Sequence, residues 1–166
     1  MVTRLSTRSS ISAVGPATDT MRAMKNHQPA GTRLSVSIVL HHSCLEMLDR
    51  VLRSLARSAE VAHGAAWVDQ VLVEVLDNSS DAEFCDKAQT AITTWPQRDF
   101  FQVVYRGLPD NRGFGAGHNV AIRHITSDFH LVLNPDAELA EDALSIGLSS
   151  LQEDSSIALV LSLIHI

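Results

Sequence analysis

Two carboxylates stand directly after short apolar runs of the 166-residue sequence, where the end of a strand would present them. Asp77, followed by Asn78, can accept a hydrogen bond from a nucleotide base or from a ribose hydroxyl. Asp136 ends an Asn134-Pro135-Asp136 turn, in which the proline fixes the backbone and stops the strand. A carboxylate held in this way suits a hard divalent cation, with diphosphate oxygens completing its shell. Taken alone, each aspartate is also an ordinary turn residue.

A glycine-rich segment between the two aspartates is the third candidate. Gly113, Gly115 and Gly117 permit close backbone approach and unusual φ values, so the segment could cradle phosphates or sugar hydroxyls. Arg112, directly before these glycines, could contact a diphosphate. His118 is interpreted as a structural residue at the start of a helix rather than as a catalyst.

Two adjacent histidines, His41 and His42, follow a further apolar run and could line the same site. Neighbouring residues of a strand point to opposite faces, so we expect that the two imidazoles do not share one metal. Cys44 and Cys85 lack the spacing of a zinc site and are expected to be free thiols in a reducing compartment.

The apolar runs in front of these polar segments predict the strands of one sheet. Four runs have the pattern of strands buried on both faces: residues 36–40 (VSIVL), 71–76 (VLVEVL), 101–105 (FQVVY) and 129–133 (FHLVL). Helical segments separate them, which indicates βαβ units and a mostly parallel α/β sheet. Ligands of such sheets bind beyond the carboxyl ends of the strands, where the polar segments stand.

The helices between these strands are predicted from capping patterns and apolar spacing. Two S-x-x-E capping boxes, at residues 43–46 and 80–83, predict helices that end near Ser58 and Thr94. A short helix is expected to run from the glycine-rich segment to Ile125, and another to span residues 141–151.

The sequence divides into three stretches. Residues 1–33 lack periodicity and are expected to form a flexible leader. Residues 34–160 are expected to form the globular region, with residues 157–160 starting another buried strand. Residues 161–166 resemble a translated transposon end and are expected to be a non-native tail. The globular region is therefore expected to be incomplete.

Composition narrows the class of protein. The chain is 45% hydrophobic and 19% charged, as is usual for a soluble globular protein. A net charge of −6 and 5% aromatic residues argue against a nucleic-acid partner. An anionic ligand would need local devices such as backbone N–H groups, a helix N-terminus or a bound metal. No apolar run is long enough to span a bilayer, and we expect a cytoplasmic protein.

Four motifs, in this order, resemble those of family 2 glycosyltransferases, especially bacterial rhamnosyltransferase-like members: VSIVL, VEVLDNSS, NRGFGAGHNVAI and HLVLNPDAEL. The resemblance implies a GT-A fold, a Rossmann-like sheet with helices on both faces. It implies inverting transfer of a sugar, with rhamnose suggested, from a dTDP- or UDP-sugar donor to a glycan or lipid-linked acceptor. It further implies cell-envelope polysaccharide biosynthesis and peripheral association with the inner face of the cytoplasmic membrane.

The resemblance also implies roles for individual residues. Asp77, with Asn78, would bind the base of the donor nucleotide, and His41 would lie beside it. The Asn134-Pro135-Asp136 turn would replace the D-x-D motif, with Asp136 facing Mg²⁺ or Mn²⁺ and the diphosphate. The donor-sugar side would be shaped by the glycine-rich segment, through Asn111, Arg112, Gly113, Gly115, Gly117 and Asn119.

Two departures from the family pattern stand out. Asn134 occupies the place of the first D-x-D aspartate, and His41-His42 replaces a common Tyr-Asn pair. The catalytic base is expected beyond Val160, so the 166-residue chain is expected to bind donor without transferring sugar.

Three alternatives remain open. The first alternative is an NAD-type dinucleotide-binding domain, whose G-x-G-x-x-G motif is followed by an acidic residue about twenty residues later, as Asp136 follows the glycines here. His118 stands where that motif needs its third glycine. A nucleotidyltransferase would carry a glycine-rich basic loop after the first strand, where this chain has HHSCLE. The third alternative is an inactive fragment that serves only as a binding module.

Overall fold

The computed structural model describes residues 1–4 and 31–161. Its strands are β1 (Val2–Arg4), β2 (Arg33–Leu40), β3 (Gln70–Asp77), β4 (Phe101–Gly107), β5 (Phe129–Leu133) and β6 (Leu159–Val160). Its helices are α1 (Leu45–Gly64), α2 (Ala82–Thr93), α3 (Phe114–Ile122) and α4 (Ala143–Glu153). Each of the four predicted strands lies within one of the observed strands, and β5 has the predicted bounds.

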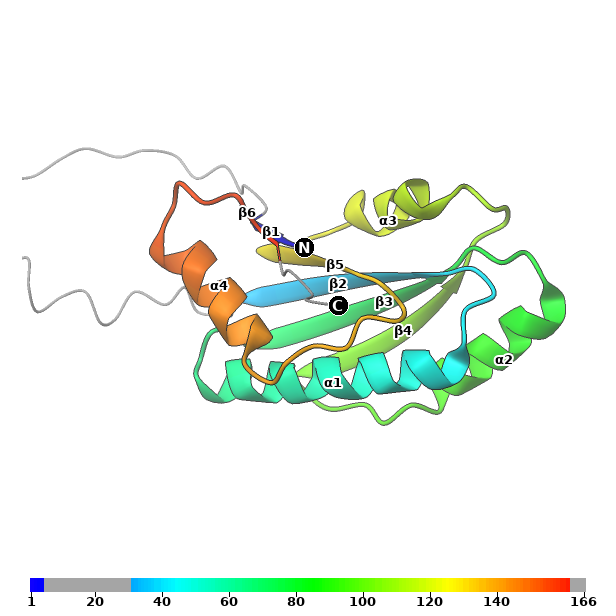
Figure 1. Ribbon diagram of the computed structural model, residues 1–166, viewed down its shortest axis with the longest axis horizontal. Helices are drawn as coiled ribbons and strands as arrows, with labels where there is room; N and C mark the ends of the chain where they lie inside the picture. The colour runs from blue at the N-terminus through cyan, green and yellow to red at the C-terminus, as the bar shows by residue number, and fades with distance from the viewer. Residues whose placement is uncertain (5–30, 162–166) are drawn as a thin grey trace, which may run out of the picture.

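The strands form one sheet in the order β4-β3-β2-β5-β1-β6 (Figure 1). The four strands β2 to β5 run parallel to one another, whereas β1 is antiparallel to both β5 and β6. The predicted α/β class, with a mostly parallel sheet, is therefore confirmed. The parallel strands bring their carboxyl ends to one edge of the sheet, which we call the carboxyl edge.

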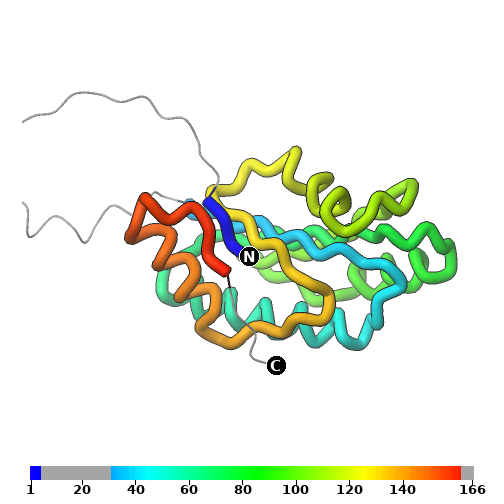
Figure 2. Tube along the Cα trace, turned by 45° about the horizontal axis from the view of Figure 1, so that its top comes forward, coloured from blue at the N-terminus to red at the C-terminus, as the bar shows by residue number. Residues whose placement is uncertain are grey.

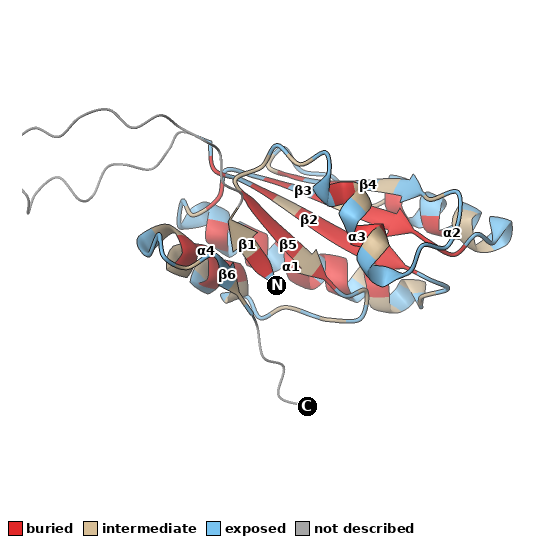
Figure 3. Cartoon of the chain, turned by 90° about the horizontal axis from the view of Figure 1, so that it is seen from above, coloured by how far each residue is buried: buried red, intermediate tan, exposed pale blue. Residues whose placement is uncertain are grey.

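Helices cover both faces of the sheet, as predicted. The apolar face of α1 repeats every three or four residues and is buried, with Leu48, Leu52 and Leu55 at most 1% exposed. α2 and α4 contribute to the same core, which we call the α1 face. α3 packs alone on the other face, which we call the α3 face, against Val39 and Leu76. Figure 3 shows the central strands buried between these layers.

The ends of the helices differ from the sequence predictions. α1 continues past Ser58 to Gly64 because Ala59 and Ala62 extend its buried face with small residues. Neither capping box forms. Cys44 begins α1 without a side-chain hydrogen bond, and Asp81 caps α2 by accepting from the Phe84 amide at 2.7 Å. α3 ends at Ile122 and α4 spans Ala143–Glu153, so both bounds shift by two or three residues from those predicted.

The first residues of the predicted leader are part of the sheet, which corrects that prediction. Val2–Arg4 forms β1 between β5 and β6, as Figure 2 shows in blue beside the red end of the described chain. Val2 is only 8% exposed. A strand of three residues is too short to show a period in the sequence, and its backbone hydrogen bonds come from distant partners. Residues 5–30 lie outside the described part of the chain.

The last described strand is also not the buried strand that was predicted. β6 contains only Leu159–Val160, and Leu159 is 45% exposed. The strand lies at the edge of the sheet, where one side has no neighbouring strand in the described part. Of the predicted tail, only Leu161 is described, and residues 162–166 lie outside that part.

The opposite edge strand, β4, is partly covered by the segment before it. The Gln97 side chain donates from Nε2 to the Val103 carbonyl at 3.1 Å and accepts from the Val103 amide through Oε1 at 2.7 Å. Arg98 and Phe101 exchange two backbone hydrogen bonds of 3.0 Å. A side-chain amide thus takes the place of a neighbouring strand for one residue of this edge.

Candidate functional site

The strand register places both predicted carboxylates at the carboxyl edge. Leu40 of β2 pairs with Asp77 of β3, and Ile38 of β2 pairs with Leu133 of β5. The turn that holds Asp136 therefore follows β5 at about the level of Asp77. One strand separates β3 from β5, so the two strand ends are about 10 Å apart. This spacing meets the geometric condition for one donor to contact both turns.

Asp77 organises the turn after β3 from a buried position. Its side chain is fully buried. Oδ1 accepts a hydrogen bond from the Ser79 amide, and Oδ2 accepts one from the Tyr105 hydroxyl, each at 2.9 Å. A base would have to approach a carboxylate whose two oxygens already have partners. Binding of a base by Asp77 stays a prediction, and its role in the turn is the one that the geometry supports directly.

The neighbours of Asp77 are held in their protonated forms. Burial, and then the hydrogen bond to Asp77, raises the pKa of Tyr105 well above its ordinary value. Burial also raises the pKa of the Cys85 thiol on α2. Tyr105 therefore remains a hydrogen-bond donor to Asp77 at neutral pH.

Asn78 and Asn111 join the turn after β3 to the start of the glycine-rich segment. Asn78 Nδ2 donates to Asn111 Oδ1 at 2.8 Å, and Asn78 Oδ1 accepts from the Arg112 amide at 3.0 Å. Asn111 Oδ1 also accepts from the Gly113 amide at 2.9 Å. The side-chain nitrogen of Asn111, Nδ2, lies 3.5 Å from His41 Nδ1. Five of the predicted site residues are thus brought together, and we call this group the asparagine bridge.

The three glycines of the glycine-rich segment differ in their structural roles. Gly113 has a φ of +79°, a conformation that other residues rarely adopt, and it begins α3. A Cβ on Gly115 would meet nothing within 4 Å. A Cβ on Gly117 would lie 2.9 Å from a methyl group of Val39, so the small size of Gly117 lets α3 approach β2. Gly117 is buried, which favours a packing role over the predicted contact with a sugar.

Three further predicted residues are exposed. Arg112 pairs through Nε with Asp110 at 2.8 Å, and Asn119 lies exposed on α3. Asn134 is exposed at the end of β5, and its carbonyl accepts from the Ala137 amide at 3.3 Å. Nothing in the described structure joins Arg112 or Asn119 to the turn after β5 by a hydrogen bond.

Asp136 is the one carboxylate of the proposed metal turn, and it is exposed. No three His, Cys, Asp or Glu side chains of residues 1–4 and 31–161 cluster as a ready metal site. Mg²⁺ commonly uses only one or two protein carboxylates and takes its other ligands from water and phosphate oxygens. Asn134 and Asp136, both exposed and two residues apart in the turn, carry oxygen atoms of the kind that binds an ion arriving with a diphosphate.

The two histidines after β2 lie closer together than the sequence suggested. The rings of His41 and His42 are 4.9 Å apart, edge to face. Because β2 ends at Leu40, strand alternation no longer separates them. His42 has a φ of +49° and donates its amide to Ser79 Oγ at 2.9 Å, while Ser80 has a φ of +59°. Such conformations cluster at functional sites, although Ala66, with a φ of +61° at the other end of α1, shows that positive φ is not confined to the carboxyl edge.

Ser79 and Tyr105 were missed by the sequence analysis. Tyr105 stands two residues before Gly107, the register partner of Asp77, and therefore lies on the same face of the sheet. A register between residues 71–77 and 101–107 would have revealed it. Ser79 belongs to the segment after β3, whose residues were interpreted only as ones that favour a turn.

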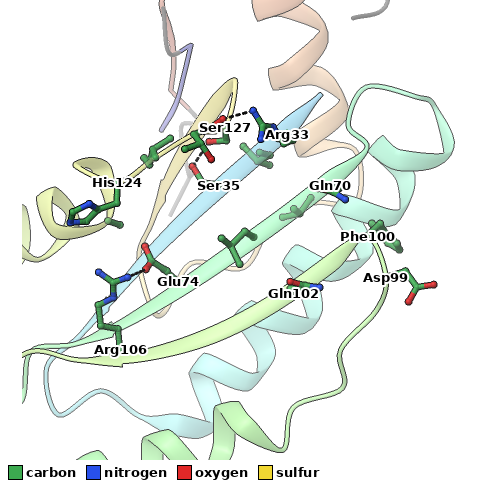
Figure 4. Close-up of a pocket in the computed structure, with 16 residues that line it drawn as sticks. Arg33, Ser35, Gln70, Glu74, Asp99, Phe100, Gln102, Arg106, His124 and Ser127 are labelled. Carbon is green, nitrogen blue, oxygen red and sulfur yellow. Dashed lines mark hydrogen bonds and ion pairs between the residues drawn. The ribbon is translucent and has the colours of Figure 1, made fainter. Parts of the chain in front are cut away.

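An open hollow of about 430 Å³ lies elsewhere, on the α3 face over β2, β3 and β4 (Figure 4). Glu74 and Arg106 form an ion pair of 2.7 Å at one end, and Arg33 and Gln70 stand at the other. None of the predicted site residues lines this hollow. The carboxyl edge therefore remains the candidate site, because the asparagine bridge and the Asn134-Pro135-Asp136 turn both lie there.

Comparison with known proteins gives one match. The family model for glycosyl transferase family 2 matches residues 35–166. No curated protein matches the chain. Within the described residues, no helix has the length and apolar character needed to cross a bilayer.

Proposed function

Because the chain belongs to glycosyl transferase family 2, we propose that its carboxyl edge binds the nucleotide-diphospho-sugar donor between the asparagine bridge and the Asn134-Pro135-Asp136 turn. Enzymes of this family transfer a sugar from a nucleotide-sugar donor to an acceptor, in general with inversion. The family match favours this function over the dinucleotide-binding alternative. The proposal concerns which residues of this chain hold which part of the donor.

The asparagine bridge is the observation that carries the proposal. It fixes the loop before α3 to the end of β3, so that His41, Asn111 and Gly113 border one exposed region. The turn with Asp136 follows β5 at the same edge, and β2 lies between β5 and β3. The nucleoside would lie beside His41 and Asn78, and the diphosphate would extend towards Asp136.

The first turn of α3 would contribute to the leaving group. The first amides of a helix have no partner within the helix, and its N-terminus carries partial positive charge. α3 begins directly after Gly113 of the asparagine bridge, at the carboxyl edge, and the guanidinium of Arg112 beside it pairs with Asp110. Such donors stabilise negative charge that develops on a diphosphate as its bond to the sugar breaks.

In the proposed reaction an acceptor hydroxyl attacks the anomeric carbon from the side opposite the diphosphate. A base takes the hydroxyl proton, the C–O bond to the acceptor forms, and the C–O bond to the diphosphate breaks. Mg²⁺ or Mn²⁺, held by Asp136 and the donor, would neutralise charge on the departing nucleotide diphosphate. The base was expected beyond Val160, and that expectation stays a prediction.

The finer identity of the substrates rests on the motif resemblance. We propose a dTDP- or UDP-sugar donor, with rhamnose as the sugar, and a glycan or lipid-linked acceptor in cell-envelope synthesis. The corresponding location is the cytoplasmic side of the membrane, with peripheral association. The resemblance rests on the order and spacing of NRGFGAGHN and LNPD, and the sugar, the acceptor and the location follow from that resemblance alone.

Calorimetric titration of the full chain tests the proposal. UDP- and dTDP-sugars with Mn²⁺ are expected to bind, whereas NADH is not. Asn111→Ala removes the centre of the asparagine bridge and is expected to weaken donor binding about tenfold. Asp136→Asn is expected to remove most of the dependence on Mn²⁺.

Asp99→Asn is the matched control, because Asp99 is an exposed aspartate beside the hollow at the opposite end of β4. Its donor affinity should equal that of the unsubstituted chain. Tighter binding of NADH than of either sugar nucleotide would overturn the proposal. Equal donor affinity in Asn111→Ala would show that the asparagine bridge does not form the site.

A further inference from the structure

A row of polar side chains lies between α3 and the sheet. His118 of α3 places Nδ1 2.7 Å from Ser37 Oγ of β2. The same Ser37 Oγ lies 2.9 Å from Nε2 of His130 on β5. Ser37 and His130 are completely buried, and His118 is 3% exposed. Two histidines and a serine therefore replace the apolar side chains that usually fill the space between a helix and a sheet.

The row continues from His130 to a backbone carbonyl. Nδ1 of His130 lies 2.8 Å from Ser35 Oγ, which lies 2.6 Å from Ser127 Oγ. Ser127 Oγ donates to the Phe129 carbonyl at 2.9 Å. The row thus ends on a group that can only accept a hydrogen bond.

Ser35 Oγ lies farther from the same carbonyl, at 3.4 Å, so the shorter contact of Ser127 assigns the direction of the row. With the Ser127 proton on the carbonyl, Ser35 donates to Ser127 and accepts from His130 Nδ1–H. A neutral imidazole with a proton on Nδ1 has a bare Nε2, so Ser37 donates to His130 Nε2. Ser37 must then accept from His118 Nδ1–H. Burial lowers the pKa of each histidine to about 4, so both rings are neutral at pH 7.

We propose that these hydrogen bonds, which all run in one direction, hold His118 and His130 as neutral Nδ1–H tautomers. We further propose that they make His118 a positioning residue for the loop before α3. The positioning part rests on the proposed function, because the loop is the one assigned to the donor. The tautomer part depends only on the hydrogen-bond geometry.

The packing of α3 shows why a directional contact matters here. α3 has nine residues, a length at which an isolated helix is marginal in water. Its apolar contact with the sheet is small, with Ala121 on Val39 and Leu76. Gly117 adds close approach but no side chain that could fix the rotation of the helix. The hydrogen bond from His118 to Ser37 supplies that constraint.

His118 is also well placed to act on the loop. It lies one helical turn after Phe114, and the two rings are 4.4 Å apart, edge to face. Phe114 directly follows Gly113, whose amide donates to Asn111 of the asparagine bridge. A change in the position of His118 is therefore passed to the loop through one helical turn.

Long-range ¹H–¹⁵N NMR of the full chain, labelled in histidine, tests the tautomers. Each resonance is assigned by its loss in His118→Asn or His130→Asn. We expect both rings to carry the proton on Nδ1 at pH 7, the opposite of the form that free histidine prefers. A proton on Nε2 of either ring, or on all four nitrogens, would overturn the proposal.

Hydrogen exchange of the α3 amides tests the positioning. Ser37→Ala is expected to speed exchange of these amides about five- to tenfold, the effect of one lost hydrogen bond. Ser58→Ala is the matched control, because Ser58 is a fully buried serine on α1 that accepts from the Leu144 amide. Its effect on α3 exchange should be negligible. Equal acceleration by both substitutions would refute a specific role for Ser37.

Two substitutions of His118 separate the hydrogen bond from the space that the ring fills. The amide of His118→Asn can still donate near the Nδ1 position, so α3 protection and donor affinity should stay close to those of the unsubstituted chain. His118→Leu fills the space without a donor and should lose both. If neither variant nor the unsubstituted chain binds a sugar nucleotide, the proposed function fails, while the tautomers and α3 exchange still decide the present proposal. Equal α3 exchange in the Asn and Leu variants would overturn it.

Discussion

The two faces of the sheet are built from different chemistry. The α1 face is one continuous apolar core, in which α1, α2 and α4 bury leucine, valine and alanine side chains against every parallel strand. The α3 face has a small apolar cluster of Val39, Leu76 and Ala121 beside the row of buried histidines and serines. Apolar burial stabilises without direction, whereas hydrogen bonds fix an orientation. The α1 face therefore supplies most of the buried apolar contact, and the α3 face carries the hydrogen bonds that we propose to orient α3 and the loop before it.

The first prediction tests where the stability resides. Leu55→Ala, on the α1 face, is expected to lower the free energy of unfolding by about 2–5 kcal/mol, because Leu55 is completely buried. Val39→Ala, on the α3 face, removes two methyl groups and should cost only about 1–2 kcal/mol. Urea denaturation measures both. An equal loss in the two variants would remove the energetic distinction between the faces.

The second prediction uses pH, since titratable side chains are buried on the α3 face. The pKa values of His118 and His130 are lowered from 6.5 to about 4 by burial. Between these values the unfolded chain binds more protons than the folded one, so stability falls as pH decreases through 6.5 and levels off below 4. The expected loss is roughly 2–3 kcal/mol per histidine. The measurement is the free energy of unfolding from pH 7.5 to 4.

The control for the pH experiment is His118→Asn, which removes one of the two buried imidazoles. Its loss of stability between pH 6.5 and 5 should be about half that of the unsubstituted chain. An unchanged slope would mean that the loss comes from other groups.

The third prediction compares two glycines of the same helix. Gly117→Ala brings a Cβ to 2.9 Å from Val39 and is expected to lower stability by about 1–3 kcal/mol. Gly115→Ala meets nothing within 4 Å and should raise stability by about 0.5–1 kcal/mol, because alanine favours a helix. Thermal unfolding distinguishes the two. The same sign of change in both variants would contradict the close packing of α3 on β2.

For the α1 face, the sequence predicted which strands and helices exist more accurately than where they begin and end. Apolar runs and leucine spacing are strong signals, and residues 129–133 were predicted at their observed bounds. α1 was predicted too short because buried alanines, such as Ala59 and Ala62, do not stand out from solvent-exposed ones. β1 was missed because a strand of three residues takes its stability from distant partners.

The position of the turns around Asp77 and Asp136 was easier to predict than the contacts that their side chains make. Strand ends in a parallel sheet meet at one edge, so the turns around Asp77 and Asp136 could be placed together from the sequence. The burial of Asp77 and its hydrogen bond to Tyr105 depend on register, which spacing alone does not show. His130 stands within an apolar run, and only the structure shows that Ser35 and Ser37 face it from β2.

The Gln97 amide has a consequence for how this protein behaves in concentrated solution. An edge strand with free backbone groups is a template on which a second chain can add, the first step towards fibrils. At Val103 both backbone groups are already satisfied by Gln97. An incoming strand must first displace a well-placed side chain, so growth from this end of the sheet has to overcome an additional barrier.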